Sequence, residues 1–178
     1  MPHLYRPFAH AKSIFEIDID FFKKMGVETL FVDLDNTLDS YKLFHPTEKA
    51  KKLIPDLIKN GIHPVIVSNN RGKRVRTYAD DLGVEYIANC AKPFPCKIKK
   101  YLKEHKLEKS QVMLVGDQMM TDVAAANGAG IRVVLTDKIV KEDQWTTHFN
   151  RIFGRMIRKY HQKKGNLIDW RTIYGKGQ

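Results

Sequence analysis

The sequence predicts an α/β fold: one Rossmann-like, doubly wound parallel sheet flanked by helices. Short apolar runs alternate along the chain with segments of helical periodicity. The segments between successive runs are long enough to cross over between parallel strands. At 178 residues, the chain has the length of one compact domain with a proper core. The expected domain spans 1–178, with an N-terminal arm over about 1–17 and a basic C-terminal segment over about 138–178.

Two strands and three helices are expected in the first half of the chain. They are a short helix over 18–25, a buried strand over 29–32, a helix over 47–60 that Thr47 could cap, a strand over 63–67 and a helix over 73–82. Gly26 ends the first of these helices. In the second helix, Leu53, Leu57 and Ile58 are expected to share one face. Pro55 interrupts that pattern, so a kink or a late start of this helix stays open.

The second half of the chain continues the alternation and ends on a basic helix. The expected elements are a short strand over 84–90, a helix over 94–107, a strand over 111–117, a helix that starts near 121 and closes on glycines, a strand over 131–136 and an amphipathic helix over 143–164. In open parallel sheets, ligands bind beyond the carboxyl ends of the strands, near a switch in strand order. The polar turns after Val32, Val67 and Val115 are expected at that edge.

Two carboxylates follow the first expected strand. Asp33 and Asp35 alternate with Leu34, so on an extended backbone they project to the same side. Two like charges so close together are costly unless they share a cation or one carboxyl holds a proton. From these residues alone, an ordinary Asp/Asn turn remains the alternative to a chemical site.

Three later turns offer groups that would complete a site for phosphoryl transfer. They contribute Ser68 with Asn69 and Asn70, then Lys92, and finally Asp117 and Asp122. In such a site, a carboxylate attacks phosphorus, Mg²⁺ and a lysine offset the phosphate charge, and a hydroxyl with backbone N–H groups holds the phosphate oxygens. Mg²⁺ prefers hard oxygen ligands, which a few carboxylates supply.

Taken in order, these turns resemble the four motifs of the haloacid dehalogenase (HAD) superfamily. The matching segments are DLDNT at 33–37, VSNN at 67–70, AKP at 91–93 and GDQMMTD at 116–122. Within that superfamily, the chain is similar to the small IIIA-type phosphatases. From about Gly26 to Leu135 it is similar to the YqeG-like branch, which also contains the phosphatidylglycerophosphate phosphatases. One such motif is a weak signal, whereas four in order at expected strand ends are specific.

The resemblance implies a role for each matching residue. Asp33 would be the nucleophile that forms an aspartyl-phosphate, and Asp35 the general acid and base. An aspartate at position 35 distinguishes phosphoester hydrolases from dehalogenases and ion-pumping ATPases, although a phosphomutase would share it. Lys92 would neutralise the nucleophile and the phosphate. Thr37 would fix the loop, and Ser68 and Asn69 would bind the phosphoryl oxygens. Mg²⁺ would be bound by Asp33, the main-chain carbonyl of Asp35, Asp117 and Asp122, the last directly or through a water.

The neighbourhood of these loops is expected to be ordinary and open. Asp39, His45 and Arg71 are interpreted as exposed loop residues. The gaps that follow Thr37 and Ser68 each have room for about one helix, and neither can hold a folded cap domain. An open site suits a bulky or macromolecular substrate, or closure by another subunit.

The formal net charge of +11 implies attraction to anions. These are phosphorylated metabolites, nucleic acid or an anionic membrane surface, with solubility as the plain alternative. Much of the charge lies in 143–164, and that helix either covers the sheet edge, pairs subunits in a homo-oligomer or lies on an anionic membrane. Cys90 and Cys96 suggest no disulfide framework, and the sequence shows no signal peptide or transmembrane run. A reduced, cytoplasmic protein, at most peripheral to the membrane, is expected.

The expected function is a Mg²⁺-dependent phosphatase that hydrolyses a phosphomonoester through an aspartyl-phosphate. Phosphatidylglycerophosphate, a phospholipid phosphate, is the substrate that the resemblance suggests, and soluble sugar or nucleotide phosphates are the alternatives. A basic RNA- or ribosome-associated protein with a secondary phosphatase site is the alternative of another class. No recognisable RNA-binding motif or run of stacking aromatics supports binding to nucleic acid.

Overall fold

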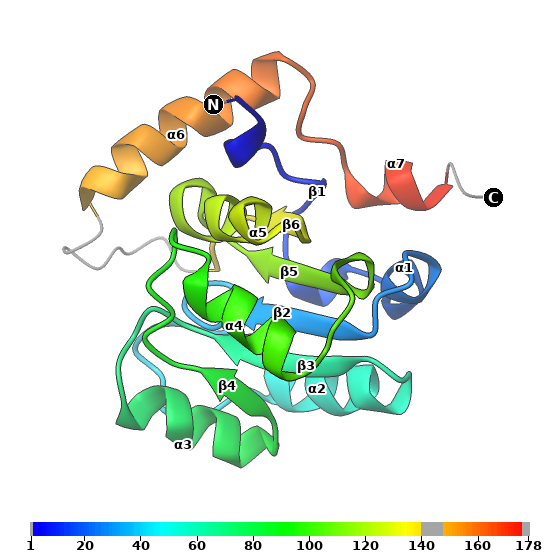
Figure 1. Cartoon of the computed structure of the whole chain (residues 1–178), viewed down its shortest axis with the longest axis vertical. Coiled ribbons are helices and arrows are strands. Elements are labelled where there is room, and N and C mark those ends of the chain that lie inside the picture. The colour runs from blue at the N-terminus through cyan, green and yellow to red at the C-terminus, as the bar shows by residue number, and fades with distance from the viewer. Residues whose placement is uncertain (1, 140–147, 176–178) are drawn as a thin grey trace.

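A six-stranded parallel sheet forms the centre of the computed structural model, in the order β1-β6-β5-β2-β3-β4 (Figure 1). The structure describes residues 2–139 and 148–175. The strands are β1 (Ala9–Ala11), β2 (Thr29–Asp33), β3 (His63–Val67), β4 (Glu85–Ile87), β5 (Val112–Gly116) and β6 (Arg132–Thr136). All five pairings between them are parallel. The predicted doubly wound α/β fold is confirmed.

Helices connect the strands and cover both faces of the sheet. They are α1 (Ile19–Lys24), α2 (Glu48–Lys59), α3 (Lys73–Leu82), α4 (Cys96–Glu104), α5 (Ala124–Ala129), α6 (His148–Lys163) and α7 (Trp170–Gly175), with 3₁₀ turns at Pro2–Tyr5, Ile14–Glu16 and Lys109–Gln111 and a π-helical turn, η4, at Met119–Val123. Only α2 lies between β2 and β3, and only α3 between β3 and β4. The described chain therefore has no cap domain in either connection, as predicted.

Two apolar cores lie on opposite faces of the sheet because successive strand residues point to opposite sides. From β2, Leu30 and Val32 pack with α1, α2, α3 and α7, whereas Phe31 packs on the other face with α4 and α5. All five residues of β2 are buried, as expected for a central parallel strand covered on both sides. This packing gives Asp33, the last residue of β2, a rigid support.

The N-terminal arm adds a strand that the sequence pattern does not reveal. Ala9–Ala11 pair with β6, and the His10 N–H donates on the outer side to the carbonyl of Ile168 at 2.8 Å. A run of three residues is too short to show the alternation that identifies a strand. The arm is thus part of the sheet, and the chain just before α7 lies along its outer side.

Helix α2 runs without a break through Pro55. Its buried face consists of Ala50, Ile54 and Leu57. The predicted place of Ile58 on that face is wrong, since this side chain is 50% exposed. At about 100° per residue, Ile58 is turned away from the line that the three buried positions form. Thr47 takes the N-cap position but makes no side-chain cap bond, and its hydroxyl donates to Asp39 instead.

Helix α6 packs against η4 on the β6 side of the domain (Figure 1). The predicted start of this helix near 143 and the side chain of Trp145 lie outside the described residues. The expectation that this helix covers the sheet edge with its apolar face is not met at Phe153, Met156 and Tyr160, which are exposed, while another side of α6 packs on η4. Within the described chain, none of the helices has the length and apolar character needed to cross a bilayer.

Candidate active site

Three aspartates meet at the carboxyl edge of the sheet, where β2 and β5 lie side by side. The chain leaves β2 toward β3 and β4 and later returns through β5 and β6, so the strand order switches at this point. Carboxylate oxygens of Asp33, Asp117 and Asp122 all lie within 4.8 Å of one another. The structure therefore brings together the three side chains that were predicted to hold a metal.

Lys92 is buried between two of these carboxylates. Its Nζ donates to Oδ1 of Asp33 at 2.5 Å, to Oδ1 of Asp122 at 2.6 Å and to the carbonyl of Val67 at 3.3 Å. Burial alone would lower the pKa of Lys92, but the attraction of Asp122 and Asp33 outweighs it and raises the pKa. The lysine is thus a fixed positive charge next to the predicted nucleophile.

The charge of Lys92 alone does not balance the negative charges on Asp33 and the carboxylates around it. Burial raises the pKa of Asp33 well above its usual value, Lys92 opposes this, and the nearby carboxylates, Asp122 first, raise it further. Its Oδ2 atom is buried and has no hydrogen-bond partner among the described residues. A buried carboxylate oxygen in that state is costly unless a further positive group binds it. Three converging carboxylates are the oxygen donors that a small divalent cation prefers, so these residues fit such an ion.

Asp122 is placed by the π-helical turn η4 and by a glycine at the end of β5. Its Oδ2 accepts a hydrogen bond from the Gln118 N–H at 3.0 Å, inside the same turn. A Cβ atom on Gly116 would lie 2.4 Å from Cγ of Asp122, closer than real atoms approach. The missing side chain at Gly116 therefore makes the room that the Asp122 carboxylate occupies.

Asp35 has both carboxylate oxygens bound by donors and is not one of the three carboxylates that converge. Oδ1 accepts from Nη1 of Arg74 at 2.7 Å, and Oδ2 accepts from the Ser68 hydroxyl at 3.0 Å and from Nδ2 of Asn70 at 2.9 Å. The three donors come from the loop after β3 and from the first turn of α3. Any contribution of Asp35 to a metal site would come from its main-chain carbonyl, as the resemblance implies.

Arg74 is the site residue that the sequence reasoning missed. The reasoning considered Arg71 instead, which is exposed, as interpreted. Arg74 lies three residues further on, and its guanidinium also donates to the carbonyl of Leu43 at 2.7 Å and to that of Ser40 at 3.1 Å. Its sequence signal is its position in the first turn of the helix that follows the VSNN segment. That position says nothing of which loop the side chain reaches.

The remaining predicted residues lie close to the cluster. Asn69 binds the main chain of Lys92 with both ends of its amide, at 2.9 and 2.8 Å, so it orients the loop that carries the lysine. Ser68 is buried, and its hydroxyl accepts the Asn70 N–H at 3.0 Å in addition to bonding Asp35. Thr37 is buried too, and its hydroxyl has no hydrogen-bond partner in the described part of the chain. Contacts of Thr37, Ser68 and Asn69 with a substrate stay predictions.

The interpretation of Asp39 as an exposed loop residue is wrong. Its carboxylate is buried and accepts hydrogen bonds from the Thr47 N–H and hydroxyl, both at 2.9 Å, and from the Tyr78 hydroxyl at 2.5 Å. The loop folds inward because Asn36 adopts a positive φ of 66° and donates its N–H to the Asp39 carbonyl at 2.7 Å. Asp39 thus fastens the loop after β2 to the start of α2 and to the middle of α3. His45 is exposed, as interpreted.

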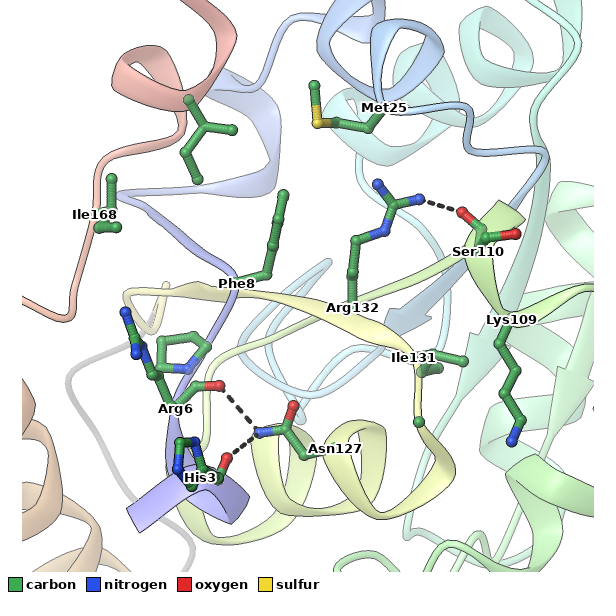
Figure 2. Close-up of a pocket in the computed structure, with 13 residues that line it drawn as sticks. His3, Arg6, Phe8, Met25, Lys109, Ser110, Asn127, Ile131, Arg132 and Ile168 are labelled. Atoms are coloured by element: carbon green, nitrogen blue, oxygen red, sulfur yellow. Dashed lines mark hydrogen bonds between the residues drawn. The ribbon is translucent and has the colours of Figure 1, made fainter. Parts of the chain in front are cut away.

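A hollow of about 1150 Å³ lies at the opposite, amino-terminal edge of the sheet (Figure 2). Figure 2 shows Asn127 donating to the carbonyls of His3 and Arg6, and Arg132 donating to that of Ser110. The predicted site residues are not among those that line it. The Asn127 bonds attach the N-terminal arm to α5, whereas the converging aspartates lie at the other edge.

Comparisons of the sequence with known proteins point to one superfamily. Residues 89–152 match the family model described as HAD-hydrolase-like. The chain is 30% identical to the probable phosphatase YqeG of Bacillus subtilis. The alignment spans 166 residues, which are 93% of this chain and 96% of the relative.

Solved structures with this fold include a Legionella pneumophila protein considered a HAD superfamily (subfamily III A) hydrolase. That protein is 16% identical, with a TM-score of 0.52 over 68% of this chain and 72% of its own. The 3-deoxy-D-manno-octulosonate 8-phosphate phosphatase of Yersinia pestis is 18% identical, with a TM-score of 0.53 over 67% of this chain and 70% of its own. At this identity the likeness concerns the fold, whereas the match to the Bacillus protein extends along nearly the whole sequence. The chain therefore belongs to the HAD superfamily of hydrolases, among its phosphatases.

Proposed function

We propose that the protein hydrolyses a phosphomonoester with the help of Mg²⁺, through an aspartyl-phosphate on Asp33. The supporting observation is the buried Oδ2 of Asp33, which has no hydrogen-bond partner among the described residues and lies beside Lys92 and the other two aspartates. Mg²⁺ would be held by Asp33, Asp117, Asp122 and the Asp35 main-chain carbonyl, and its chemistry is to offset the charge of the phosphate.

In the first step, a carboxylate oxygen of Asp33 bonds to phosphorus while the bond from phosphorus to the ester oxygen breaks. Lys92 stabilises the negative charge on the phosphoryl oxygens and holds Asp33 Oδ1 in place. The departing alkoxide takes a proton from the Asp35 carboxyl. A substrate alcohol thus leaves, and the phosphoryl group stays on Asp33.

In the second step, the same Asp35 carboxylate takes a proton from a water that attacks the phosphorus of the aspartyl-phosphate. The bond to Asp33 breaks, inorganic phosphate leaves, and both aspartates return to their starting states. Asp35 is well placed for this exchange because its carboxylate is only partly buried and lies two residues from the nucleophile. Ser68, Asn70 and Arg74 each donate to the Asp35 carboxylate and so fix its position.

For the substrate, we propose phosphatidylglycerophosphate. The described chain has no cap that would have to close over a small molecule, so a bulky ester can approach the carboxyl edge of the sheet. A net charge of +11 favours an anionic substrate at an anionic surface. The activity would then consume a lipid phosphomonoester and release the lipid alcohol and phosphate.

The test is a phosphatase assay on a panel that contains an aryl phosphate, soluble sugar and nucleotide phosphates, and phosphatidylglycerophosphate in mixed micelles. We expect Mg²⁺-dependent release of phosphate that a chelator stops, with the lipid as the best substrate by kcat/KM. Asp33→Asn should abolish release from every substrate, whereas the exposed control Asp80→Asn should leave it unchanged. Full activity of Asp33→Asn would contradict the mechanism, and a higher kcat/KM for a soluble phosphate would contradict the lipid substrate.

A further inference from the structure

Helix α6 carries a stripe of large apolar side chains that faces solvent. Phe153 is 56% exposed, Met156 62% and Tyr160 50%. These positions are three and four residues apart, so they lie one above another on a single side of the helix. We call the stripe of Phe153, Met156 and Tyr160, together with the lysines beside it, the α6 outer face.

The opposite side of α6 is fixed to the domain, so the stripe cannot turn inward. Arg158 donates to the Thr136 carbonyl at 3.5 Å and pairs with Asp137, both just at the end of β6. His161 is buried and bonds Asn166 at 3.1 Å. Figure 1 shows the helix lying along the outside of the domain, beyond α5 and β6. One side of α6 is therefore used for packing, and the outer face is left to a partner.

The charge around the outer face indicates what that partner is. Lys159 and Lys163 follow Met156 by three and seven residues, so they lie along one flank of the apolar stripe, and Lys164 lies on the other flank. The segment 148–164 contains no aspartate or glutamate. A second copy of the same face would bring lysines against lysines, which disfavours pairing between two α6 helices. An anionic lipid surface suits both the apolar stripe and the flanking lysines, since the apolar side chains enter the acyl boundary while the lysines contact the headgroups.

We propose that the α6 outer face docks the protein on an anionic lipid bilayer, with α6 lying in the plane of the interface. The helix is too polar on its flanks to enter the hydrocarbon core, and only the apolar stripe is immersed. Docking depends on two additive contributions, burial of Phe153, Met156 and Tyr160 and attraction of the lysines to acidic headgroups.

Docking on this face would hold the domain at the lipid surface. The inner side of α6 packs on η4, the turn that carries Asp122, so the docked helix is joined directly to the site. The segment after β6 also contacts the loop after β2, because the Ile139 N–H donates to the Asn36 carbonyl at 2.9 Å. If the substrate is a lipid phosphate, docking keeps the enzyme at the surface that contains it, and only this consequence rests on the proposed function.

The experiment is sedimentation of the full chain with sucrose-loaded vesicles of phosphatidylcholine, with and without phosphatidylglycerol. We expect binding to the anionic vesicles that weakens as salt is added. The triple variant Phe153→Ser/Met156→Ser/Tyr160→Ser should lower the partition coefficient by more than roughly tenfold. Lys159→Gln/Lys163→Gln should lower it by about tenfold on anionic vesicles and leave binding to neutral vesicles unchanged.

Matched controls change the same residue types elsewhere on the surface. Ile58→Ser removes an exposed apolar side chain from α2, and Lys52→Gln/Lys103→Gln removes two exposed lysines from α2 and α4. Neither control should change partition by more than about twofold. Hydrolysis of a soluble aryl phosphate should be the same in all five proteins, which shows that each is folded.

Three results would overturn the proposal. One is equal sedimentation of the wild type with and without anionic lipid. Another is partition that the controls lower as much as the outer-face variants do, which would mean diffuse charge attraction. A third is a wild-type dimer in sedimentation velocity that the triple variant converts to a monomer, because the face would then pair two copies. Vesicle binding without phosphatase activity would leave the docking intact and contradict the proposed function instead.

Discussion

Arg74 Nη1 lies 2.7 Å from Oδ1 of Asp35. This contact joins α3, the helix after β3, to the loop that follows β2. The same guanidinium donates to the Leu43 and Ser40 carbonyls, so it ties Asp35 to the chain that follows it. A planar fork with several donors can do this, and a single ammonium cannot. Arg74 therefore positions Asp35, the proposed proton carrier.

Arg74→Ala should lower kcat/KM for an alkyl phosphate by roughly ten- to a hundredfold, because kcat/KM reports the first step, in which the alkoxide cannot leave without a proton from Asp35. The kcat/KM for a nitrophenyl phosphate, whose leaving group needs no proton, should fall much less. Arg74→Lys should recover only part of the kcat/KM for the alkyl phosphate. If kcat/KM falls to the same extent for both substrates, the role of Arg74 is structural only.

Gly116→Ala should disturb the cluster of Asp33, Asp117 and Asp122 indirectly, by displacing the Asp122 side chain. The added methyl would overlap the Asp122 carboxylate, which must then move away from Lys92 and Asp33. We expect a loss of about 1–3 kcal/mol in the free energy of unfolding and a smaller Mg²⁺-dependent rise in the melting temperature. The comparison variant is Gly175→Ala, where a Cβ would meet nothing within 4 Å. An unchanged Mg²⁺ effect in Gly116→Ala would show that Asp122 does not help to hold the ion.

Tyr78→Phe should weaken the fold near the catalytic loop. The Tyr78 hydroxyl donates to the buried Asp39 carboxylate, and burial followed by this bond raises the pKa of the tyrosine. Removing the donor leaves a buried carboxylate one hydrogen bond short, at a cost of about 1–3 kcal/mol in urea unfolding. Tyr86→Phe, which loses a bond from the exposed Arg76, should cost less than about 0.5 kcal/mol. Equal costs for the two variants would mean that the Asp39 network adds nothing special.

The two cysteines should react very differently with iodoacetamide. Cys96 is exposed at the start of α4, whereas Cys90 is fully buried and burial raises the pKa of its thiol. A raised pKa means less thiolate at any given pH below it, and thiolate is the reactive form. Peptide mapping after brief labelling at pH 8 should therefore find the label on Cys96, and on Cys90 only after unfolding. Labelling of native Cys90 at a comparable rate would show that the loop before Lys92 opens.

Much of the fold and the centre of the site follow from the sequence, and particular residues show why. The apolar runs before Asp33 and Asp117 are long enough to identify strands, and parallel strands bring their carboxyl ends to one edge. The convergence of Asp33, Asp117 and Asp122 was predictable on that basis. This prediction did not require knowing which strands are neighbours in the sheet, because the motifs lie at the carboxyl ends of the strands.

What the sequence could not show depends on contacts between distant segments. β1 has three residues and becomes a strand only because β6 is beside it. Asp39 looks like a loop acid until Asn36 turns the chain and Tyr78 meets it from α3. Arg74 and Asp35 are 39 residues apart, and no spacing rule relates a helix side chain to a loop carboxylate.

The bond from His10 to the Ile168 carbonyl has a consequence for where the domain can be cut. Residues 166–175 shield the backbone polar groups on the outer side of β1, and Trp170 in this stretch packs its ring against Phe21 at 5.6 Å. A protein truncated after residue 135, where the motif-bearing part finishes, would present a bare strand to other molecules. Such strands template intermolecular sheet growth, so we expect that fragment to aggregate although every residue of the proposed active site is present. A stable fragment should therefore keep residues 166–175 together with β1.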